Sequence, residues 1–103
     1  MNLGNTIKNV RVKLGISQKD LAEKCKMSPA YLWEIENNEK EPSIGKLKII
    51  ANALNMPLPV LFFLSFDYDD IKPEKREAVA LLETSIRGLM TDLFLNYPLV
   101  NDK

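Results

Sequence analysis

The side chains best suited to specific hydrogen bonding lie close together in residues 28–37. They offer hydroxyl, carboxylate and carboxamide groups: Ser28, Tyr31, Glu34 and Asn37. Leu32 and Ile35 are spaced to line the opposite side of a helix, which leaves the outer side of this stretch free for a partner. These side chains are therefore suited to binding another molecule through hydrogen bonds.

The side chains that usually carry catalysis are scarce. The 103 residues include no histidine, the usual general base and commonest metal ligand, and a single cysteine, Cys25. Cys25 falls on the apolar side of a predicted helix, which favours a buried thiol over a nucleophile. The sequence also has no glycine loop that could cradle a phosphate and no pair of carboxylates in an evident cleft. It predicts no enzyme, no cofactor and no metal site.

Two short helices separated by a tight turn are predicted over residues 17–38. Ser17 can cap the first helix, and Asp20 three residues later completes a capping-box pattern. Ser28 can cap the second, with Pro29 at the first helical position. Helices this short are not stable alone and must pack on other elements. With the outer face of the second helix free, this is the layout of a helix-turn-helix.

Residues 5–64 resemble the Cro/C1-type helix-turn-helix family of phage repressors and related bacterial regulators. The matching motifs are I-x-x-x-R-x-x-x-G-I-S-Q-x-x-L-A from Ile7 to Ala22, then MSPAYLWEIEN, EPS at Glu41 to Ser43, and LKIIANALNM from Leu47 to Met56. The resemblance covers about three fifths of the chain. It implies an all-α, five-helix (lambda-repressor-like) DNA-binding domain over residues 1–66, and it does not specify the operator sequence.

The resemblance makes residues 28–37 the recognition helix. Its DNA-contacting residues would be Ser28, Pro29, Ala30, Tyr31, Trp33, Glu34 and Asn37. Glu34 could accept a hydrogen bond from a cytosine amino group, and Ala30 could contact a thymine methyl group. No Arg or Lys lies in this helix, although arginine to guanine is the commonest specific contact. Trp33 could bury an edge against a neighbouring helix or lie on the DNA backbone.

The resemblance also implies contacts that carry no base information. Gln18 and the amides at the start of its helix would bind a phosphate, as would Asn37, while Lys40 and Lys46 would lie near phosphates. In the family an arginine at the position of Arg11 pairs with a glutamate at the end of the recognition helix. That glutamate is Glu36 here, so the pair would tie the first helix to the third.

The fourth and fifth helices complete the predicted domain. Ser43 is expected to cap a fourth helix whose inward residues are Ile44, Leu47, Ile50, Ala51 and Leu54. Residues 57–66 predict a short fifth helix that is apolar on all sides and so must be covered on all sides. An acidic linker, residues 67–72, then marks the boundary between the domain, 1–66, and a C-terminal segment, 67–103.

One long helix is predicted over residues 73–97. Apolar residues recur in it at alternating intervals of three and four, the heptad pattern of paired helices: Val79, Leu82, Ile86, Leu89 and Leu93. With Phe62 and Phe63 these are the predicted dimerisation residues; Leu81, Met90, Phe94 and Leu95 broaden the apolar side. The alternative is a core helix folded back on its own domain. A homodimer is favoured because a DNA reader of this type needs two half-sites.

The net charge is zero but unevenly distributed. Residues 1–56 hold nine basic and six acidic residues, a net +3, and residues 57–103 hold five and eight, a net −3. The basic excess therefore lies on the predicted DNA-binding half. A single cysteine, no signal peptide and no apolar run of membrane-spanning length indicate a cytoplasmic protein without membrane contact.

The predicted function is that of a sequence-specific DNA-binding transcriptional regulator, a dimeric repressor that binds a palindromic operator in double-stranded DNA. Gln18, Asn37 and the intact turn favour it. The alternative is a protein-interaction module on the same fold, an antitoxin or regulatory subunit with weak or no DNA binding. The zero net charge and the acidic Glu34 favour that alternative.

Overall fold

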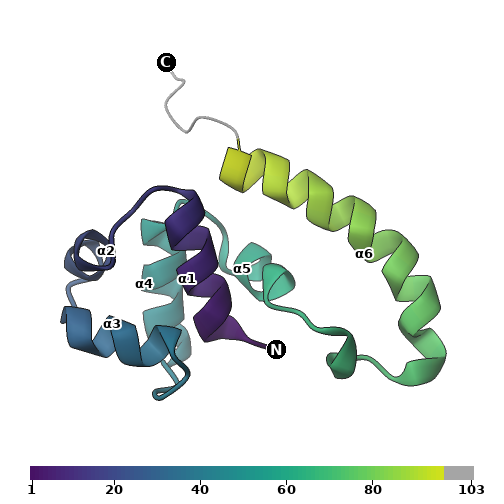
Figure 1. Ribbon diagram of the computed structural model, residues 1–103, viewed down its shortest axis with the longest axis horizontal. Coiled ribbons are helices and arrows are strands. Elements are labelled where there is room, and N and C mark those ends of the chain that lie inside the picture. Colours follow the sequence, from purple (N-terminus) through teal and green to yellow (C-terminus); the bar gives the residue numbers. More distant parts are fainter. Residues whose placement is uncertain (97–103) are drawn as a thin grey trace.

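The computed structural model describes residues 1–96, which contain helices and no strand (Figure 1). Five helices come first: α1 (Leu3–Lys13), α2 (Gln18–Lys24), α3 (Pro29–Glu36), α4 (Ile44–Ala53) and α5 (Leu58–Leu64). Two 3₁₀ turns, Tyr68–Asp70 and Pro73–Lys75, lead to α6 (Arg76–Thr91), and a π-helical turn, Asp92–Asn96, completes the described part. The all-α fold class predicted from the sequence is confirmed.

Helices α1 to α5 pack around one hydrophobic core. Its fully buried large side chains come from all five helices and their caps: Ile7, Leu21, Leu32, Ile35, Ile50, Leu54 and Leu61. This core holds α2 and α3 in place, because helices of seven and eight residues do not persist alone. Cys25 is buried beside it, as predicted, and burial raises the pKa of the thiol.

Short-range hydrogen bonds define where the helices begin and end. The side-chain hydroxyls of Ser17, Ser28 and Ser43 each accept a hydrogen bond from the backbone N–H three residues on, at 3.0, 3.0 and 3.2 Å. Gly15 and Asn38 follow α1 and α3 with φ of 73° and 60°. This left-handed conformation turns the next amides back onto carbonyls of the last helical turn. The caps predicted at Ser17, Ser28 and Ser43 are confirmed.

The residues of α4 that were predicted to face inward belong to the core, with one exception. Ile44 was predicted to face inward but is 56% exposed. The prediction was wrong because Ile44 is the first residue of α4, and the core begins one turn later at Leu47. Among the described residues no single helix is both long and apolar enough to cross a membrane. Helices α4 and α5 reach that length and hydropathy only together, and they are bent by 93° relative to each other.

Helix α6 lies beside α5, set apart from the other helices (Figure 1). Three side chains near its C-terminal end, Met90, Phe94 and Leu95, pack against the core cluster. The predicted single helix over 73–97 is instead a 3₁₀ turn, α6 and a π-helical turn, and Tyr97 lies outside the described residues. The division of the chain at residue 66 stays a prediction.

Candidate nucleic-acid interface

A tight turn joins α2 to α3. Lys26 takes a left-handed conformation, with φ of 56°, directly after α2. Its N–H donates to the carbonyl of Glu23 at 3.1 Å, and the N–H of Met27 donates to that of Ala22 at 3.0 Å. Ser28 then caps α3. The two helices of the predicted motif are therefore connected as the sequence pattern indicates.

A buried hydrogen-bond network ties α1, α2 and α3 together. The Nε and Nη2 atoms of Arg11 donate to the two carboxylate oxygens of Glu36 at 2.8 and 3.0 Å. The Arg11 side chain is 11% exposed and that of Glu36 only 1%. Arg11 Nη1 also donates to the carbonyl of Ile16 at 3.0 Å, which anchors the loop before α2. The Arg11–Glu36 pair implied by the family resemblance is confirmed.

Gln18 joins this network from the first position of α2. Its Nε2 donates to Oε1 of Glu36 at 3.0 Å, and its side chain is half-buried. A primary amide nitrogen carries two hydrogens, so one donor position of Gln18 remains for another acceptor. The carboxylate of Glu36 thus holds a side chain predicted to bind phosphate, a link that the sequence pattern did not reveal.

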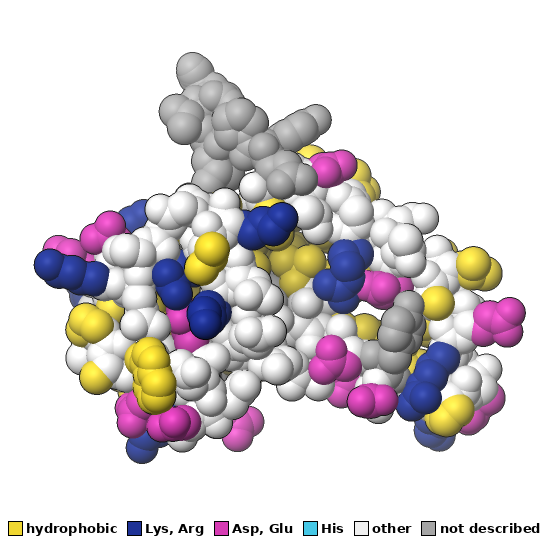
Figure 2. Space-filling view, viewed as in Figure 1, with side chains coloured by type: hydrophobic (Ala, Val, Ile, Leu, Met, Phe, Trp, Pro, Cys, Tyr) yellow, Lys and Arg dark blue, Asp and Glu magenta, His cyan; other side chains and the backbone are white. Residues whose placement is uncertain are grey.

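The outer side of α3 is open to solvent along its length. Ser28, Pro29 and Ala30 are exposed at its N-terminal end, Trp33 is 46% exposed, and Glu34 is half-buried. Hydrophobic and acidic side chains gather over α3 at the lower left of Figure 2. The structure therefore brings the predicted base-contacting residues onto one surface. Trp33 is partly packed, with nearly half of its surface left free.

Tyr31 is only partly accessible to solvent. Its ring is half-buried and packs against the core cluster, because it lies on the side of α3 that faces α4. The ammonium group of Lys46, from the first turn of α4, lies 5.1 Å from the ring centroid. The contact places the cation of Lys46 directly beside α3.

The remaining predicted phosphate contacts lie at the C-terminal end of α3. Asn37 is exposed, and its Nδ2 donates to the carbonyl of Trp33 at 2.9 Å. Lys40 is exposed in the loop that follows, and its backbone N–H donates to the carbonyl of Glu34 at 3.2 Å. Both residues are therefore accessible to a partner near the C-terminal end of α3.

Gly4 is a structural requirement that the sequence pattern did not reveal. A Cβ atom at this position would lie 2.3 Å from the carbonyl oxygen of Ile35 and 2.9 Å from that of Glu36. Glycine therefore allows α1 to approach the end of α3 closely enough for the Arg11–Glu36 pair to form. The available signal was a glycine inside a predicted helix, which costs stability and often has a packing reason.

A second missed feature is a hollow of about 410 Å³ at the end of α2. Its lining residues include three lysines: Lys24, Lys26 and Lys46, beside Cys25, Met27 and Ile49. These lysines come from α2, the turn and α4, so only the packing of α4 on α2 brings them together. They add positive charge next to α3, which has no basic residue of its own.

The sequence matches the family described as helix-turn-helix over residues 7–61, from α1 into α5. The chain belongs to the helix-turn-helix family. The family predicted from the motifs is thereby confirmed. Helices α1 to α5 are called the helix-turn-helix domain from here on.

Three relatives show how far the similarity extends. The chain is 34% identical to the immunity repressor protein of Bacillus phage phi105 over 61 residues, 59% of this chain and 42% of that protein. It is 34% identical to the transcriptional regulator ClgR of Mycobacterium tuberculosis over 59 residues, 57% of this chain and 53% of ClgR. It is 42% identical to the HTH-type transcriptional regulator SutR of Escherichia coli over 55 residues, 53% of this chain and 31% of SutR. The chain spans about half the length of these relatives or less.

Two crystal structures of the clp gene regulator ClgR from Corynebacterium glutamicum are similar in fold. One aligns with a TM-score of 0.61 and 26% identity over 85% of this chain and 86% of that chain. The other aligns with a TM-score of 0.60 and 30% identity over 62% of this chain and 83% of that chain. The longer alignment exceeds the extent of the helix-turn-helix domain.

Helix α6 offers a second candidate surface. Four of its predicted dimerisation residues are 38% to 66% exposed: Leu82, Ile86, Leu89 and Leu93. Leu81 is 76% exposed, whereas Val79, Phe62 and Phe63 are half-buried. Met90, Phe94 and Leu95 turn to the core instead. The structure thus divides the apolar side of α6: part folds back on its own domain, and an exposed stripe, residues 82, 86, 89 and 93, faces solvent.

Proposed function

We propose that this chain is a sequence-specific DNA-binding transcriptional regulator that acts as a dimeric repressor on a palindromic operator. The observation that carries the proposal is the open outer face of α3 beside Gln18, whose amide is held by Glu36 at 3.0 Å. The three relatives support it, since one is named as a repressor and the other two as transcriptional regulators. We place its action in the cytoplasm.

The proposed reading of bases follows from the side chains on α3. Glu34 has a carboxylate that can accept a hydrogen bond from the amino group of cytosine, and the methyl group of Ala30 suits the methyl group of thymine. Trp33 adds an apolar surface and an indole N–H donor. Because α3 has no arginine or lysine, direct contact to guanine contributes less than in many readers of this kind.

Phosphate contacts position α3 in the groove. We assign them to residues of α2, α3, the loop after α3 and α4, each at least partly accessible: Gln18, Ser28, Asn37, Lys40 and Lys46. Hydrogen bonds from these groups to phosphate fix register without reading sequence. The net +3 of residues 1–56 provides the salt-dependent part of the affinity.

The dimer is assigned to α6. The residues of the exposed stripe are large, apolar and at heptad spacing, and exposed apolar patches often mark partner sites. Val79, Phe62 and Phe63, half-buried, would form the border of the contact. Two copies joined there would present two recognition helices about 34 Å apart, one turn of DNA, and so match a palindromic operator.

A second candidate function is that of a protein-interaction module, an antitoxin or regulatory subunit. It is favoured by the composition of α3, which has an exposed Trp33 and an acidic Glu34 but no basic residue. Aromatic side chains of this kind are frequent anchors in protein interfaces. DNA binding by the purified chain decides between the two functions.

The test is a mobility-shift assay on DNA upstream of the chain's own gene, followed by selection from random-sequence DNA. Wild type should select a palindrome. Glu34→Ala should change the preference at one position of each half-site by about 1–3 kcal/mol. Gln18→Ala should weaken binding to all sequences alike. If wild type binds no DNA above non-specific competitor, or if both variants bind as wild type does, α3 is not a DNA reader.

A further inference from the structure

Helix α6 is attached to the helix-turn-helix domain in two ways. At its C-terminal end Met90, Phe94 and Leu95 pack against the core cluster. One turn earlier, the side chain of Arg87 reaches from α6 to the end of α5. The first attachment is apolar and non-directional, whereas the second is made of hydrogen bonds and has a defined direction.

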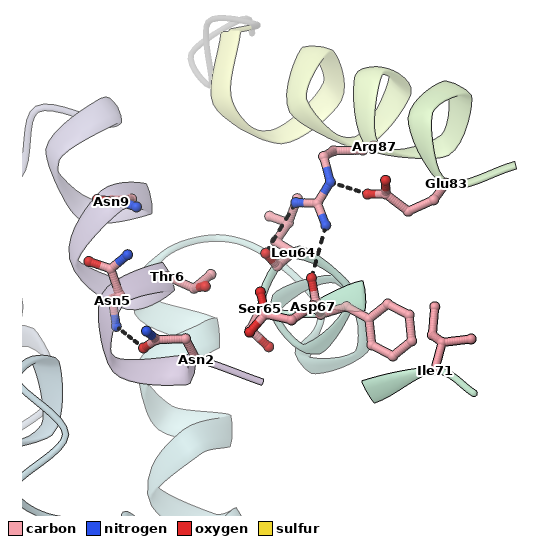
Figure 3. A pocket seen from close by; sticks show the side chains of 11 residues that line it. Asn2, Asn5, Thr6, Asn9, Leu64, Ser65, Asp67, Ile71, Glu83 and Arg87 are labelled. Carbon is pink, nitrogen blue, oxygen red and sulfur yellow. Dashed lines mark hydrogen bonds and ion pairs between the residues drawn. The ribbon is translucent and has the colours of Figure 1, made fainter. Parts of the chain in front are cut away.

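Arg87 contacts three separate parts of the structure (Figure 3). Its Nη1 donates to the carbonyl of Leu64 at 3.2 Å, and its Nη2 donates to the carbonyl of Phe66 at 3.4 Å. Its Nε pairs with Glu83 one turn back on α6. The guanidinium carbon lies 5.6 Å from the centroid of the Phe63 ring. One side chain therefore links α6, the last turn of α5 and the start of the linker.

The end of α5 is a suitable acceptor for a guanidinium group. The last carbonyls of a helix have no partner within the helix, and the C-terminal end carries partial negative charge. Leu64 is the last residue of α5, and the chain leaves the helix through Ser65 and Phe66. The planar fork of Arg87 meets two carbonyls with two different nitrogens, so the contact restricts the direction of α6 as well as its distance.

On the side of α1 the packing leaves space for α6 to tilt. A groove of about 420 Å³ lies between α1 and α6, with Asn2, Asn5, Thr6 and Asn9 of α1 and its N-cap on one wall and Glu83 and Arg87 on the other. The close-up shows Arg87 pointing across toward the end of α5, with the polar residues of α1 opposite (Figure 3). The hollow between α1 and α6 is also visible in the space-filling view (Figure 2). Apolar packing does not fill this side, so the hydrogen bonds of Arg87 are a directed contact between α6 and the end of α5.

We infer that Arg87 is a positioning residue that fixes the angle of α6 against the helix-turn-helix domain and thereby sets the half-site spacing that the dimer accepts. This inference rests on the proposed dimeric function. Arg87 lies in the same turns of α6 as the exposed stripe, but its side chain reaches toward α5. The proposed contact with the second copy and the contact with the helix-turn-helix domain are therefore made by the same short segment of α6.

A small rotation at α6 moves α3 by a large distance, because the two helices lie toward opposite ends of the molecule (Figure 1). The longest dimension is 42 Å. A rotation of about 10° at one end of such a length moves the other end by about 7 Å, or about two base-pair steps of 3.4 Å. Losing the Arg87 contacts should therefore broaden the range of accepted spacings without changing either half-site.

The first test measures the angle within one chain. Spin labels are placed on Lys48→Cys in α4 and Leu81→Cys in α6, in a Cys25→Ala background, and labelled protein is diluted with unlabelled protein to suppress distances between chains. Wild type should give a narrow distance distribution, and Arg87→Met should widen it at least about twofold. Lys75→Met, which removes an exposed cation just before α6, is the matched control and should leave the width unchanged. Equal widths for wild type and Arg87→Met would overturn the inference.

The second test measures affinity for paired half-sites as their centre-to-centre spacing varies in single base-pair steps around about ten. Wild type should prefer its best spacing over one two base pairs longer by about tenfold or more, and Arg87→Met by less than about threefold, with equal affinity for a single half-site. A wild type without any spacing optimum would contradict the dimeric function itself, while the distance measurement still tests Arg87. An unchanged optimum and width in Arg87→Met would overturn the role of Arg87 alone.

Sedimentation equilibrium and far-ultraviolet circular dichroism accompany both tests. If Arg87→Met dissociates the dimer, Arg87 supports assembly and not spacing, and the inference is wrong. If Arg87→Met loses helix content, Arg87→Lys decides, because lysine keeps the charge and can reach one carbonyl. Arg87→Lys should give a distance distribution wider than that of wild type and a weaker preference for one half-site spacing. Values identical to wild type would contradict the need for two directed bonds.

Discussion

Replacing Arg11 by methionine should leave the carboxylate of Glu36 buried with one of its three side-chain hydrogen bonds. Those bonds are two from Arg11, at 2.8 and 3.0 Å, and one from Gln18, at 3.0 Å. The Glu36 side chain is only 1% exposed, so water cannot replace the lost donors. Breaking a buried ion pair by removing one partner costs about 3–5 kcal/mol. We expect a loss of this size for Arg11→Met and for Glu36→Met.

The double variant separates the ion pair from the packing around it. With both charges gone, two methionines can fill the site, so Arg11→Met with Glu36→Met should be less destabilised than either single variant. The coupling energy, the sum of the two single losses minus the loss of the double variant, should then be at least about 3–5 kcal/mol. Urea unfolding followed at 222 nm measures it, and a stability of about 5–15 kcal/mol leaves a transition to fit. Lys13→Met, at an exposed position of α1, is the control. A coupling energy near zero would refute the reasoning.

Three further predictions concern single positions. Gly4→Ala should destabilise the domain by more than about 2 kcal/mol, because the new Cβ would lie 2.3 Å from the carbonyl oxygen of Ile35. Gly45→Ala, whose Cβ would meet only a side chain at 3.8 Å, should stabilise α4 by about 0.5–1 kcal/mol. Thermal unfolding compares the two variants, and equal effects would contradict the close approach of α1 to α3. Lys26→Gly should raise the free energy of unfolding by up to about 1 kcal/mol, since φ of 56° favours glycine. A lower free energy of unfolding, measured in urea, would show that the lysine side chain stabilises the fold by more than the strained φ angle destabilises it. Leu89→Asp should convert the dimer to monomer in sedimentation equilibrium while the melting of the helix-turn-helix domain stays unchanged, and an unaltered sedimentation mass would exclude the exposed stripe as the interface.

Local features of this chain could be predicted from its sequence. Ser17, Ser28 and Ser43 cap the starts of α2, α3 and α4, and Gly15 and Asn38 follow the ends of α1 and α3. Such positions depend only on hydrogen bonds and φ angles within a few residues. The spacing of the apolar residues likewise predicted α2 and α3. The Arg11–Glu36 pair joins residues 25 apart, so spacing alone could not predict it. The family resemblance supplied that expectation.

Other features depend on how the helices meet in space. Gly4 is required only because α1 crosses the end of α3, and Gln18 bonds to Glu36 only because that carboxylate is already oriented by Arg11. Ile44 has the spacing of a core residue but lies where no neighbouring helix covers it. In each case the deciding contact comes from a residue distant in sequence, which periodicity does not identify.

The apolar side of α6 shows the same limit most clearly. The sequence by itself determined that this helix has more apolar surface than one neighbour needs, through the heptad residues and those that broaden them. Only the tertiary structure decided that Met90, Phe94 and Leu95 cover the core while Leu82, Ile86, Leu89 and Leu93 stay exposed. The physical reason is that burial of apolar side chains is non-directional, so the side of α6 that is covered depends on contacts with residues distant in sequence, among them the hydrogen bonds of Arg87 to the end of α5.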